Sequence, residues 1–237
     1  MERSKSIKII GDSKVVVSPA NESTELDRPL YAINWFNLKR LWMYNLYNLL
    51  VASHLKKVNG KALYKGIGIK RILEEDPELD RRMLLVVYYP SADAFLKLVS
   101  NRLFLLKSVF RINSVKDFCI AFSKRFDKGE KPKTSGLYKG DCFYMAHVFH
   151  KGSVDTAIEL PSLSDGITCL FHGEKTADIG RQKGNEDVQN APFPIEGVVV
   201  WESKSKDALL SFSESPEYSE FKNRLGKSNM YLQKRIL

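Results

Sequence analysis

The sequence predicts an α+β fold made of two ferredoxin-like βαββαβ units in tandem, whose antiparallel sheets pack face to face as an α/β barrel within one chain. Three observations support this prediction. The order β-α-β-β-α-β can be read along residues 30–125, and a similar order returns along residues 142–237. The central strands are also apolar on both faces, so a sheet covered by helices on one side only would leave an apolar face bare.

The first unit begins with a strand and a long helix. Leu30–Phe36 is rich in β-branched and aromatic residues, which favours a strand. Leu38–Asn59 has apolar residues at helical spacing, and Gly60 follows as a helix stop. The apolar stripe consists of Met43, Leu46, Tyr47, Leu50, Val51, His54 and Val58.

Three strands and a second helical region complete the first unit. Lys61–Leu73 reads as a long strand with a bulge or bend at its two glycines. Met83–Tyr89 is a nearly continuous apolar run and so predicts a central strand. A helix beginning at Ser91, a second helical piece over Leu103–Phe110 and a strand over Val115–Ser123 follow.

Short segments of the first unit return in the same order in the second unit. Each similarity between segments is weak alone, but together the similar segments fall on the same predicted elements and indicate an internal repeat. The pairs are Tyr31–Asn37 with Tyr144–His150, Leu63–Gly66 with Leu170–Gly173, Asp93–Leu96 with Asp207–Leu210, and Asp117–Lys124 with Tyr231–Ile236.

The domain prediction separates the two units by a linker. In the second unit, the first helix (Val154–Leu160) is short, and a long polar loop over Asp178–Pro192 joins two strands. Phe126–Lys139 is charged and rich in Gly and Pro, which is typical of a linker. The predicted boundaries are a polar lead-in at 1–29, units at 30–125 and 142–237, and a linker at 126–141.

Composition places the chain among ordinary globular proteins. It has 237 residues, of which 43% are hydrophobic and 27% charged. No apolar run approaches the roughly 20 residues that a membrane span needs, and the N-terminus lacks a secretory signal. The lead-in has room for a short strand at Lys8–Ile10 or Lys14–Val17. Three widely spaced cysteines suggest neither disulfides nor a zinc site, and we expect a cytoplasmic protein without a membrane partner.

The net charge of +9 permits anionic partners. Basic and acidic residues are mixed along the chain without a block of like charge, so the sequence argues against nucleic-acid binding. Self-association through sheet edges or helices is the other expected interaction.

The stretch Tyr31–Gly66 and the segment Val86–Phe95, together with Ser215–Tyr218, resemble the dimeric α/β-barrel superfamily. Within it the chain is similar to the family called domain of unknown function 1330. The resemblance implies a barrel that usually forms between two subunits but here would form within one chain. Relatives include haem-degrading monooxygenases, small-molecule oxygenases, isomerases and ligand-binding modules, so haem is one cofactor that the resemblance raises. The superfamily shares no catalytic set, and no residue role carries over.

Three histidines are the acid–base candidates, and each has packing as its alternative. His54 lies in the apolar stripe of the first helix, where packing is the usual role. His147 lies on the first strand of the second unit and His172 on the next strand along the chain. We expect these two strands to be neighbours, which would let the two imidazoles meet across the sheet. No carboxylate at a suitable spacing predicts a metal site.

Matched polar positions are the other candidates. Asn34 corresponds to His147 and Lys65 to His172 in the repeat, and buried polar groups need a partner, which can be a ligand or a structural hydrogen bond. Tyr31, Tyr144 and Trp201 would suit an apolar or aromatic ligand, with core packing as the alternative. The expected function is therefore a small-molecule enzyme, oxygenase- or isomerase-like as the resemblance implies, acting on an apolar or aromatic carbonyl or enol compound. A non-catalytic ligand-binding or interaction protein is the alternative, and a haem-binding or haem-degrading protein is the second alternative. The divergence between the repeats places the chemistry in the second unit.

Overall fold

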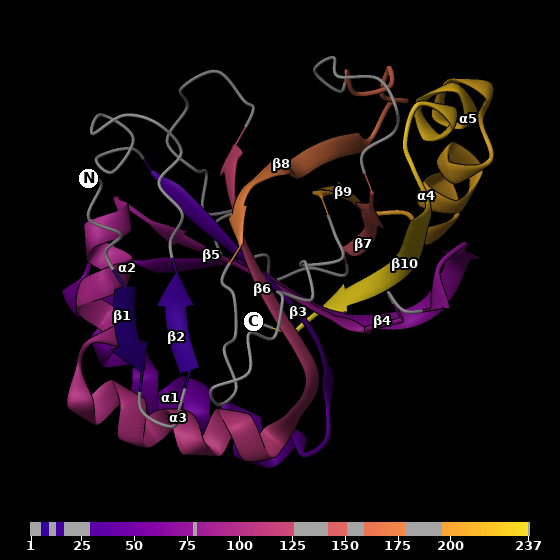
Figure 1. Ribbon diagram of the computed structural model, residues 1–237. Helices are drawn as coiled ribbons and strands as arrows, with labels where there is room; N and C mark the ends of the chain where they lie inside the picture. Colours follow the sequence, from indigo (N-terminus) through magenta and orange to yellow (C-terminus); the bar gives the residue numbers. More distant parts are fainter. Residues whose placement is uncertain are drawn as a thin grey trace, which may run out of the picture. The chain divides into compact units, whose positions relative to one another are not determined.

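The computed structural model describes the backbone of residues 6–9, 13–16, 29–77, 80–125, 142–150, 159–178 and 196–236 (Figure 1). The strands are β1 (Ser6–Ile9), β2 (Ser13–Val16), β3 (Leu30–Leu38), β4 (Lys61–Glu74), β5 (Met83–Tyr89), β6 (Val115–Arg125), β7 (Phe143–Phe149), β8 (Ile167–Asp178), β9 (Gly197–Ser203) and β10 (Ser228–Arg235). The helices are α1 (Leu41–Lys57), α2 (Ala92–Val99), α3 (Arg102–Ser114), α4 (Lys206–Ser213) and α5 (Pro216–Asn223).

Contacts group these elements into two compact units. Unit 1 holds β3, β6 and helices α1 to α3, and unit 2 holds β7, β9, β10, α4 and α5. Strands β4, β5 and β8 contribute residues to both units, and the last residue of β6, Arg125, belongs to unit 2. Among the described residues, none of the helices is long and apolar enough to cross a membrane.

The strand order confirms the predicted fold class. From β3 onward, hydrogen bonds link the strands in the order β10-β4-β5-β3-β6-β8-β9-β7, and β7 pairs in turn with β10. The pairs β10–β4, β10–β7, β3–β6, β7–β9 and β8–β9 are antiparallel. Strands β1 and β2 pair separately and lie near the two alternative positions, Lys8–Ile10 and Lys14–Val17, at one of which the sequence allowed a short strand. The chain is an α+β protein with the strand order of the predicted α/β barrel.

The helices of unit 1 cover one face of β3 and β6. Ser91 accepts a hydrogen bond from the Ala94 amide at 3.2 Å and so caps α2, whose Phe95 packs into the sheet. The Phe95 ring meets the Phe122 ring of β6 edge to face at 4.8 Å between centroids. The core on this face consists of Ala32, Val87, Tyr89, Ala94, Phe95, Leu98, Val99, Phe104 and Phe122.

Unit 2 repeats this arrangement with α4 and α5. Serine caps begin both helices, because Ser205 accepts from the Ala208 amide at 3.1 Å and Ser215 from the Tyr218 amide at 3.2 Å. Pro216 occupies the first turn of α5, where its missing N–H costs nothing. The core between these helices and the sheet includes Met145, Phe149, Val199, Trp201, Leu209, Phe212, Tyr218, Phe221, Met230 and Leu232.

The predicted strand with two glycines is confirmed as β4. Its pairing with β10 shifts register twice, which is the predicted irregularity. A Cβ on Gly66 would lie 2.0 Å from the Tyr64 hydroxyl and 2.5 Å from Oε1 of Gln233. Gly66 is therefore required by the close packing of these two side chains.

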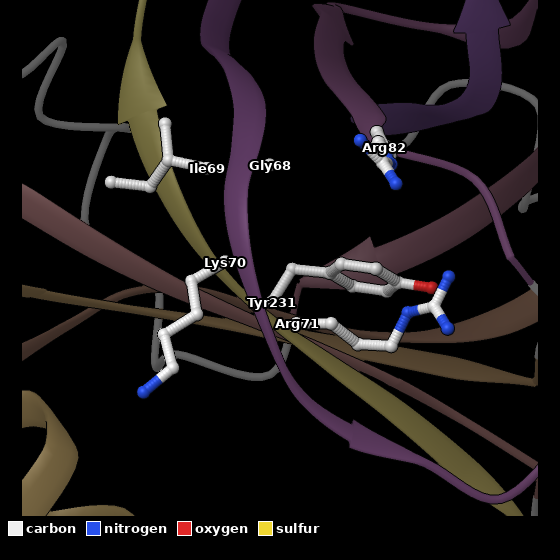
Figure 2. Close-up of a pocket in the computed structure, with 6 residues that line it drawn as sticks. All are labelled: Gly68, Ile69, Lys70, Arg71, Arg82 and Tyr231. Atoms are coloured by element: carbon white, nitrogen blue, oxygen red, sulfur yellow. The ribbon is translucent and has the colours of Figure 1, made fainter.

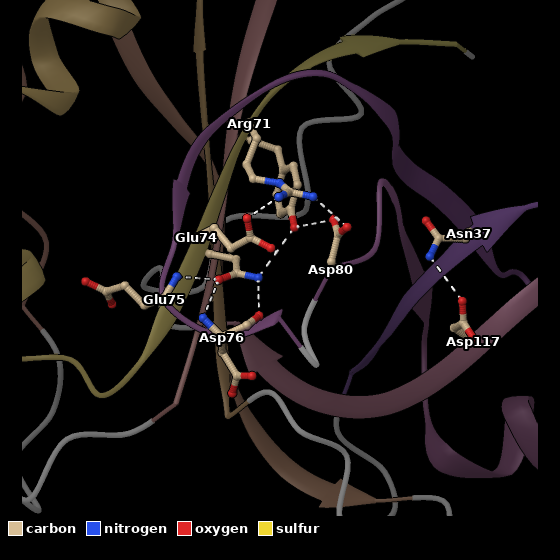
Figure 3. Close-up of polar contacts among 9 residues, drawn as sticks. Asn37, Arg71, Glu74, Glu75, Asp76, Asp80 and Asp117 are labelled. Carbon is tan, nitrogen blue, oxygen red and sulfur yellow. Dashed lines mark hydrogen bonds and ion pairs between the residues drawn. The ribbon is translucent and has the colours of Figure 1, made fainter.

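A bulge also occurs in unit 1, where β3 pairs with β6. The register shifts between Trp35 and Asn37, and Asp117 on β6 has a φ of 52°. Asp tolerates this left-handed conformation better than most residues do. The Asn37 amide donates to the Asp117 carboxylate at 3.2 Å, which holds the bulge in place (Figure 3).

The first helix is shorter than predicted. It begins at Leu41 rather than Leu38, because the amides of Lys39 and Arg40 donate to the Ser114 carbonyl at 2.8 and 3.1 Å before the helix starts. The predicted linker (Phe126–Lys139) lies outside the described residues. So do all but the last two residues of the predicted helix Val154–Leu160 and all but the first residue of the loop Asp178–Pro192.

Candidate functional site

A row of polar side chains crosses three strands of unit 2 on the face opposite to α4 and α5. Tyr144 of β7 is the register partner of Gln233 on β10 and of Glu202 on β9. The preceding or following residue on each strand (Met145, Trp201 and Leu232) belongs to the core under the helices. Because successive side chains of a strand point to opposite faces, the polar row occupies the other face of the sheet.

Two further residues extend this row. The Tyr64 hydroxyl of β4 donates to Oε1 of Gln233 at 2.7 Å, and the Tyr64 and Tyr144 rings lie 5.3 Å apart between centroids. Arg235 lies two residues beyond Gln233 on β10 and so shares its face. The name Tyr144 cluster is used below for Tyr64, Tyr144, Glu202, Gln233 and Arg235.

The electrostatics of the cluster centre on the Tyr144 phenol. Burial is the main cause that raises the pKa of Tyr144 to about 12, the Glu202 carboxylate raises it further, and the Arg235 guanidinium opposes the rise. The phenol is therefore neutral at ordinary pH and retains its O–H as a donor. Among the described residues, no hydrogen bond of good geometry reaches the buried Tyr144 hydroxyl or Oε2 of Glu202, although the phenol lies close enough to Glu202 and Arg235 for side-chain hydrogen bonds to affect its pKa. Buried polar atoms without partners are rare in proteins and have unused capacity to bind water or a ligand.

A pocket opens beside Tyr231, two residues before Gln233 on β10. It is a small, partly open pocket of roughly 80 Å³ and lies at the start of β5, where the Gly68 amide donates to the Arg82 carbonyl at 2.7 Å. Figure 2 shows the Tyr231 ring and the Arg71 side chain lying alongside each other on the same side of β4. The pocket is lined by Gly68, Ile69, Lys70, Arg71, Arg82 and Tyr231.

The cations of this pocket are partly neutralised. Arg71 forms ion pairs with Glu74 and, at 2.5 Å, with Asp80, and the Tyr231 hydroxyl donates to the other Asp80 oxygen at 3.0 Å (Figure 3). Burial and the neighbouring Asp80 carboxylate raise the pKa of Tyr231, so its phenol is also neutral. These contacts fix the β4–β5 connection.

Asn229 holds the same connection from β10. Its buried side chain accepts from the amides of Glu75 and Asp76, both at 3.0 Å, and donates to the Asp76 carbonyl at 2.7 Å (Figure 3). Glu75 in turn accepts from the Ser228 amide at 3.0 Å and pairs with Lys222 of α5 at 2.8 Å. These contacts therefore stabilise the connection between β4 and β5.

His147 lies on the helix face of the sheet, opposite to the Tyr144 cluster. It is fully buried, and its Nδ1 lies 2.7 Å from the Tyr218 hydroxyl, which itself donates to Met230 Sδ at 3.0 Å. A proton on Nδ1 satisfies both contacts and leaves Nε2 bare, without a partner among the described residues. Burial lowers the pKa of His147 to about 3, because a second proton would charge a ring in an aromatic core.

The expectation that His147 and His172 lie on neighbouring strands is wrong. Val199 of β9 is the register partner of both residues, so β9 lies between β7 and β8. Two strand spacings amount to about 10 Å, which keeps the imidazoles from a shared contact. Burial lowers the pKa of His172 to about 4.

The candidates of unit 1 occupy packed positions. The Asn34 amide donates to the carbonyls of Ala32 and Leu85 at 3.2 and 3.3 Å, which is the structural hydrogen bonding named as one alternative. His54 is buried on α1, with its ring 6.4 Å from the Phe104 ring between centroids. Burial, with Lys107 and Lys57 nearby, lowers the pKa of His54. The Tyr31 ring packs at 5.6 Å from the Tyr88 ring.

The remaining candidates of unit 2 divide between the two faces. Tyr144 belongs to the polar cluster. Trp201 is fully buried in the core under the helices, with ring centroids 5.4 Å from Tyr218 and 5.7 Å from Phe212. Lys65 is buried, and its burial lowers the pKa of the ammonium group.

Haem, which the resemblance raised, does not fit His147. An axial histidine needs open space on the side of the coordinating nitrogen. The His147 ring is instead surrounded by the rings of Phe149, Trp201, Tyr218 and Phe221, at 5.6 to 6.2 Å between centroids. Nowhere in the described ranges do three His, Cys, Asp or Glu side chains gather as a metal site.

Sequence reasoning missed Glu202, Gln233 and Arg235. Glu202 stands out because it is a carboxylate in the otherwise apolar run of β9, all seven residues of which are buried. A buried Glu needs a partner, which marks it as a candidate. No such signal existed for Gln233 and Arg235, because their contacts depend on a register between distant strands.

No family model matches the chain and no curated protein matches it, so the similarity to domain of unknown function 1330 is not confirmed. Several solved structures resemble it. An anthrone oxidase-like protein is 14% identical, with 89% of this chain and 92% of that chain covered and a TM-score of 0.47. A chlorite dismutase variant from Candidatus Nitrospira defluvii is 8% identical, with 88% and 91% covered and a TM-score of 0.44. A Rhodopseudomonas palustris protein of unknown function is 18% identical, with 45% and 85% covered and a TM-score of 0.37.

Proposed function

We propose that the chain binds a small carbonyl or enol compound at the Tyr144 cluster and transfers a proton on it. The observation that supports the proposal is a buried phenol and a buried carboxylate on register-paired residues: the Tyr144 hydroxyl and Oε2 of Glu202 lie close together, but their contact lacks good hydrogen-bond geometry. A carbonyl or enol oxygen accepts from a phenol, and the adjacent C–H or O–H gives its proton to a carboxylate. One ligand of this class would therefore satisfy both atoms.

The roles in the proposed reaction follow from the chemistry of each group. Glu202, as carboxylate, takes the proton from the carbon next to the carbonyl, and the C–H electron pair moves to form an enolate. The neutral Tyr144 phenol donates a hydrogen bond to the developing oxyanion, and the Arg235 guanidinium adds positive charge nearby. Return of the proton from Glu202 to either end of the enolate completes an isomerisation, so no oxidant is required.

The pocket at Tyr231 supports the proposal by its position. Tyr231, Gln233 and Arg235 occupy alternate positions of β10 and so share one face, about 6.6 Å apart from one to the next. Small and aliphatic side chains lie beside this track, because Ala146 is the register partner of Tyr231 and of Val200. Tyr231, which lines the pocket, therefore lies among buried neighbours on the same face of β10 as the Tyr144 cluster.

The test is hydrogen exchange on 2-tetralone, an aromatic ketone with exchangeable hydrogens next to its carbonyl. We expect the full chain to accelerate their replacement by deuterium in D2O, followed by proton NMR. Glu202→Gln should lower the protein-dependent exchange rate by about 100-fold or more, because a general base typically contributes an acceleration of about that size. Tyr144→Phe should lower it too. Tyr218→Phe, which changes an equally buried tyrosine on the helix face, is the matched control and should keep the rate.

Two results would decide against proton transfer. A wild-type chain that binds 2-tetralone in a thermal-shift assay without accelerating exchange would support the non-catalytic alternative. Neither binding nor exchange with 2-tetralone and a set of related ketones would remove the proposal altogether.

A further inference from the structure

The outer faces of α1 and α3 carry a concentration of exposed apolar side chains. Trp42 and Leu49 on α1 are 64% and 74% exposed, and Leu106 on α3 is 63% exposed. Of the eleven large apolar side chains exposed in the described part of the chain, eight lie on these two helices. The other five are Leu41, Leu103, Val109, Phe110 and Ile112. A concentration of exposed large apolar side chains of this kind indicates a binding face. These eight residues are called the α1–α3 face below.

The two helices form one platform within unit 1. Lys107 Nζ of α3 donates to the Leu50 carbonyl of α1 at 3.0 Å, and the Arg111 guanidinium lies 6.0 Å from the centre of the Tyr47 ring. Figure 1 shows α1 and α3 lying together. Their 17 and 13 residues correspond to lengths of about 26 and 20 Å. The result is a broad two-helix surface.

The charge of this platform has one sign. No Asp or Glu occurs from residue 28 to residue 73, or from residue 94 to residue 116, so neither helix carries a carboxylate. Exposed cations stand at the ends of both helices and flank the apolar middle: Lys39, Arg40, Lys56 and Lys57 for α1, and Arg102 and Lys116 for α3. Long basic side chains at such positions can extend their charged ends to a polar boundary while their stems cover apolar surface.

We propose that the α1–α3 face docks on an anionic lipid bilayer surface. Exposed Trp and Leu with cations and no carboxylates match an interfacial helix, which lies in the plane of the headgroups. Apolar insertion and attraction to acidic headgroups then act together. A second copy of the same face would place these cations against like charges, which disfavours a two-fold dimer here. This proposal departs from the expectation of no membrane partner, which rested on the absence of a spanning segment, because docking on the surface needs none.

The chain contains its own reporter for this interaction. Of its three tryptophans, Trp35 and Trp201 are fully buried, whereas Trp42 is on the α1–α3 face. A change in tryptophan emission on docking therefore reports Trp42. We expect a shift to shorter wavelength when vesicles containing about one-third phosphatidylglycerol are added, and little change with phosphatidylcholine alone. Added salt should weaken the response.

Variants separate the apolar and electrostatic contributions. Leu49→Ser combined with Leu106→Ser should lower the partition coefficient measured by vesicle flotation by about tenfold or more, since two aliphatic side chains no longer insert. Lys56→Glu combined with Lys57→Glu should cause a similar loss on anionic vesicles. Ile69→Ser, which changes an exposed apolar residue of β4 (51% exposed), is the matched control and should bind like the wild type. All these sites are exposed, so the variants should fold, as far-UV circular dichroism can verify.

Two results would overturn the proposal. One is the absence of both the emission shift and flotation with anionic vesicles. The other is self-association of the wild type in solution that Leu49→Ser with Leu106→Ser abolishes, which would assign the face to a contact between copies. Neither result bears on hydrogen exchange at the Tyr144 cluster.

Discussion

Replacing His147 by Gln should make the stability of the protein less dependent on pH. The imidazole is fully buried on the helix face, and burial lowers its pKa to about 3. In the unfolded chain its pKa returns to about 6.5. Between these two values the unfolded state binds a proton that the folded state does not. The free energy of unfolding therefore falls as the pH falls below about 6.5, and the loss continues down to the folded pKa.

The size of the effect follows from the two pKa values. Between about pH 7.5 and about pH 5, protonation of one such histidine in the unfolded chain alone costs about 2 kcal/mol of stability. His172, whose pKa burial lowers to about 4, should contribute a similar amount. The wild type should thus lose about 4 kcal/mol from both histidines, and His147→Gln about half of that. Glutamine can keep a hydrogen bond to Tyr218 but does not titrate.

Urea unfolding at the two pH values measures this difference directly. The informative quantity is the change in unfolding free energy from high to low pH, compared between His147→Gln and the wild type. Tyr218→Phe serves as the control, because it removes the 2.7 Å contact to Nδ1 but keeps the imidazole. That variant should be less stable at both pH values but retain the wild-type pH dependence. Equal pH dependence in His147→Gln and the wild type would refute the burial argument.

Two further predictions test the packing that positions the inner face. Asn229→Ala should lower the unfolding free energy by about 2–4 kcal/mol in urea, because two loop amides lose their acceptor, whereas Asn229→Asp keeps the acceptor and should lose less. Gly66→Ala should cost about 1–3 kcal/mol, since its Cβ would overlap the Tyr64 hydroxyl. Part of that loss should be recovered in a Tyr64→Phe background; the same loss in both backgrounds would contradict the proposed overlap.

Local patterns in the sequence were sufficient to place most elements. Met83–Tyr89 is a strand with the predicted bounds, because a short apolar run with β-branched residues has few other stable conformations. The similar segments also fall on corresponding elements: Tyr31 and Tyr144 on β3 and β7, and Asp93 and Asp207 in the first turns of α2 and α4. Each of these predictions rests on short stretches of sequence, and none of them requires knowing which distant strands pair.

Pairing between distant strands could not be read in the same way. The mistaken neighbourhood of His147 and His172 arose because chain order was taken for spatial order, whereas β9 lies between their strands. The α1 periodicity likewise indicated a helix but could not show that Leu49 would remain 74% exposed, since burial depends on where α3 packs. Register and helix packing are tertiary properties, and they decide which polar residues meet.

Alternation along β7 places His147, one of the matched polar positions of the predicted repeat, on a different face from Tyr144. Asn34 is hydrogen-bonded in its packed surroundings. His147 uses Nδ1 for its contact with Tyr218 on the helix face, while its buried Nε2 has no partner among the described residues. Tyr144, three residues before His147, lies on the opposite face, where its hydroxyl lies beside Glu202 and Arg235 without a hydrogen bond of good geometry. Changes at His147 should therefore alter stability and its pH dependence, and changes at Tyr144 should alter ligand binding. The unfolding measurements therefore test the role of His147, and the exchange measurements independently test the role of Tyr144 on the other face of the same strand.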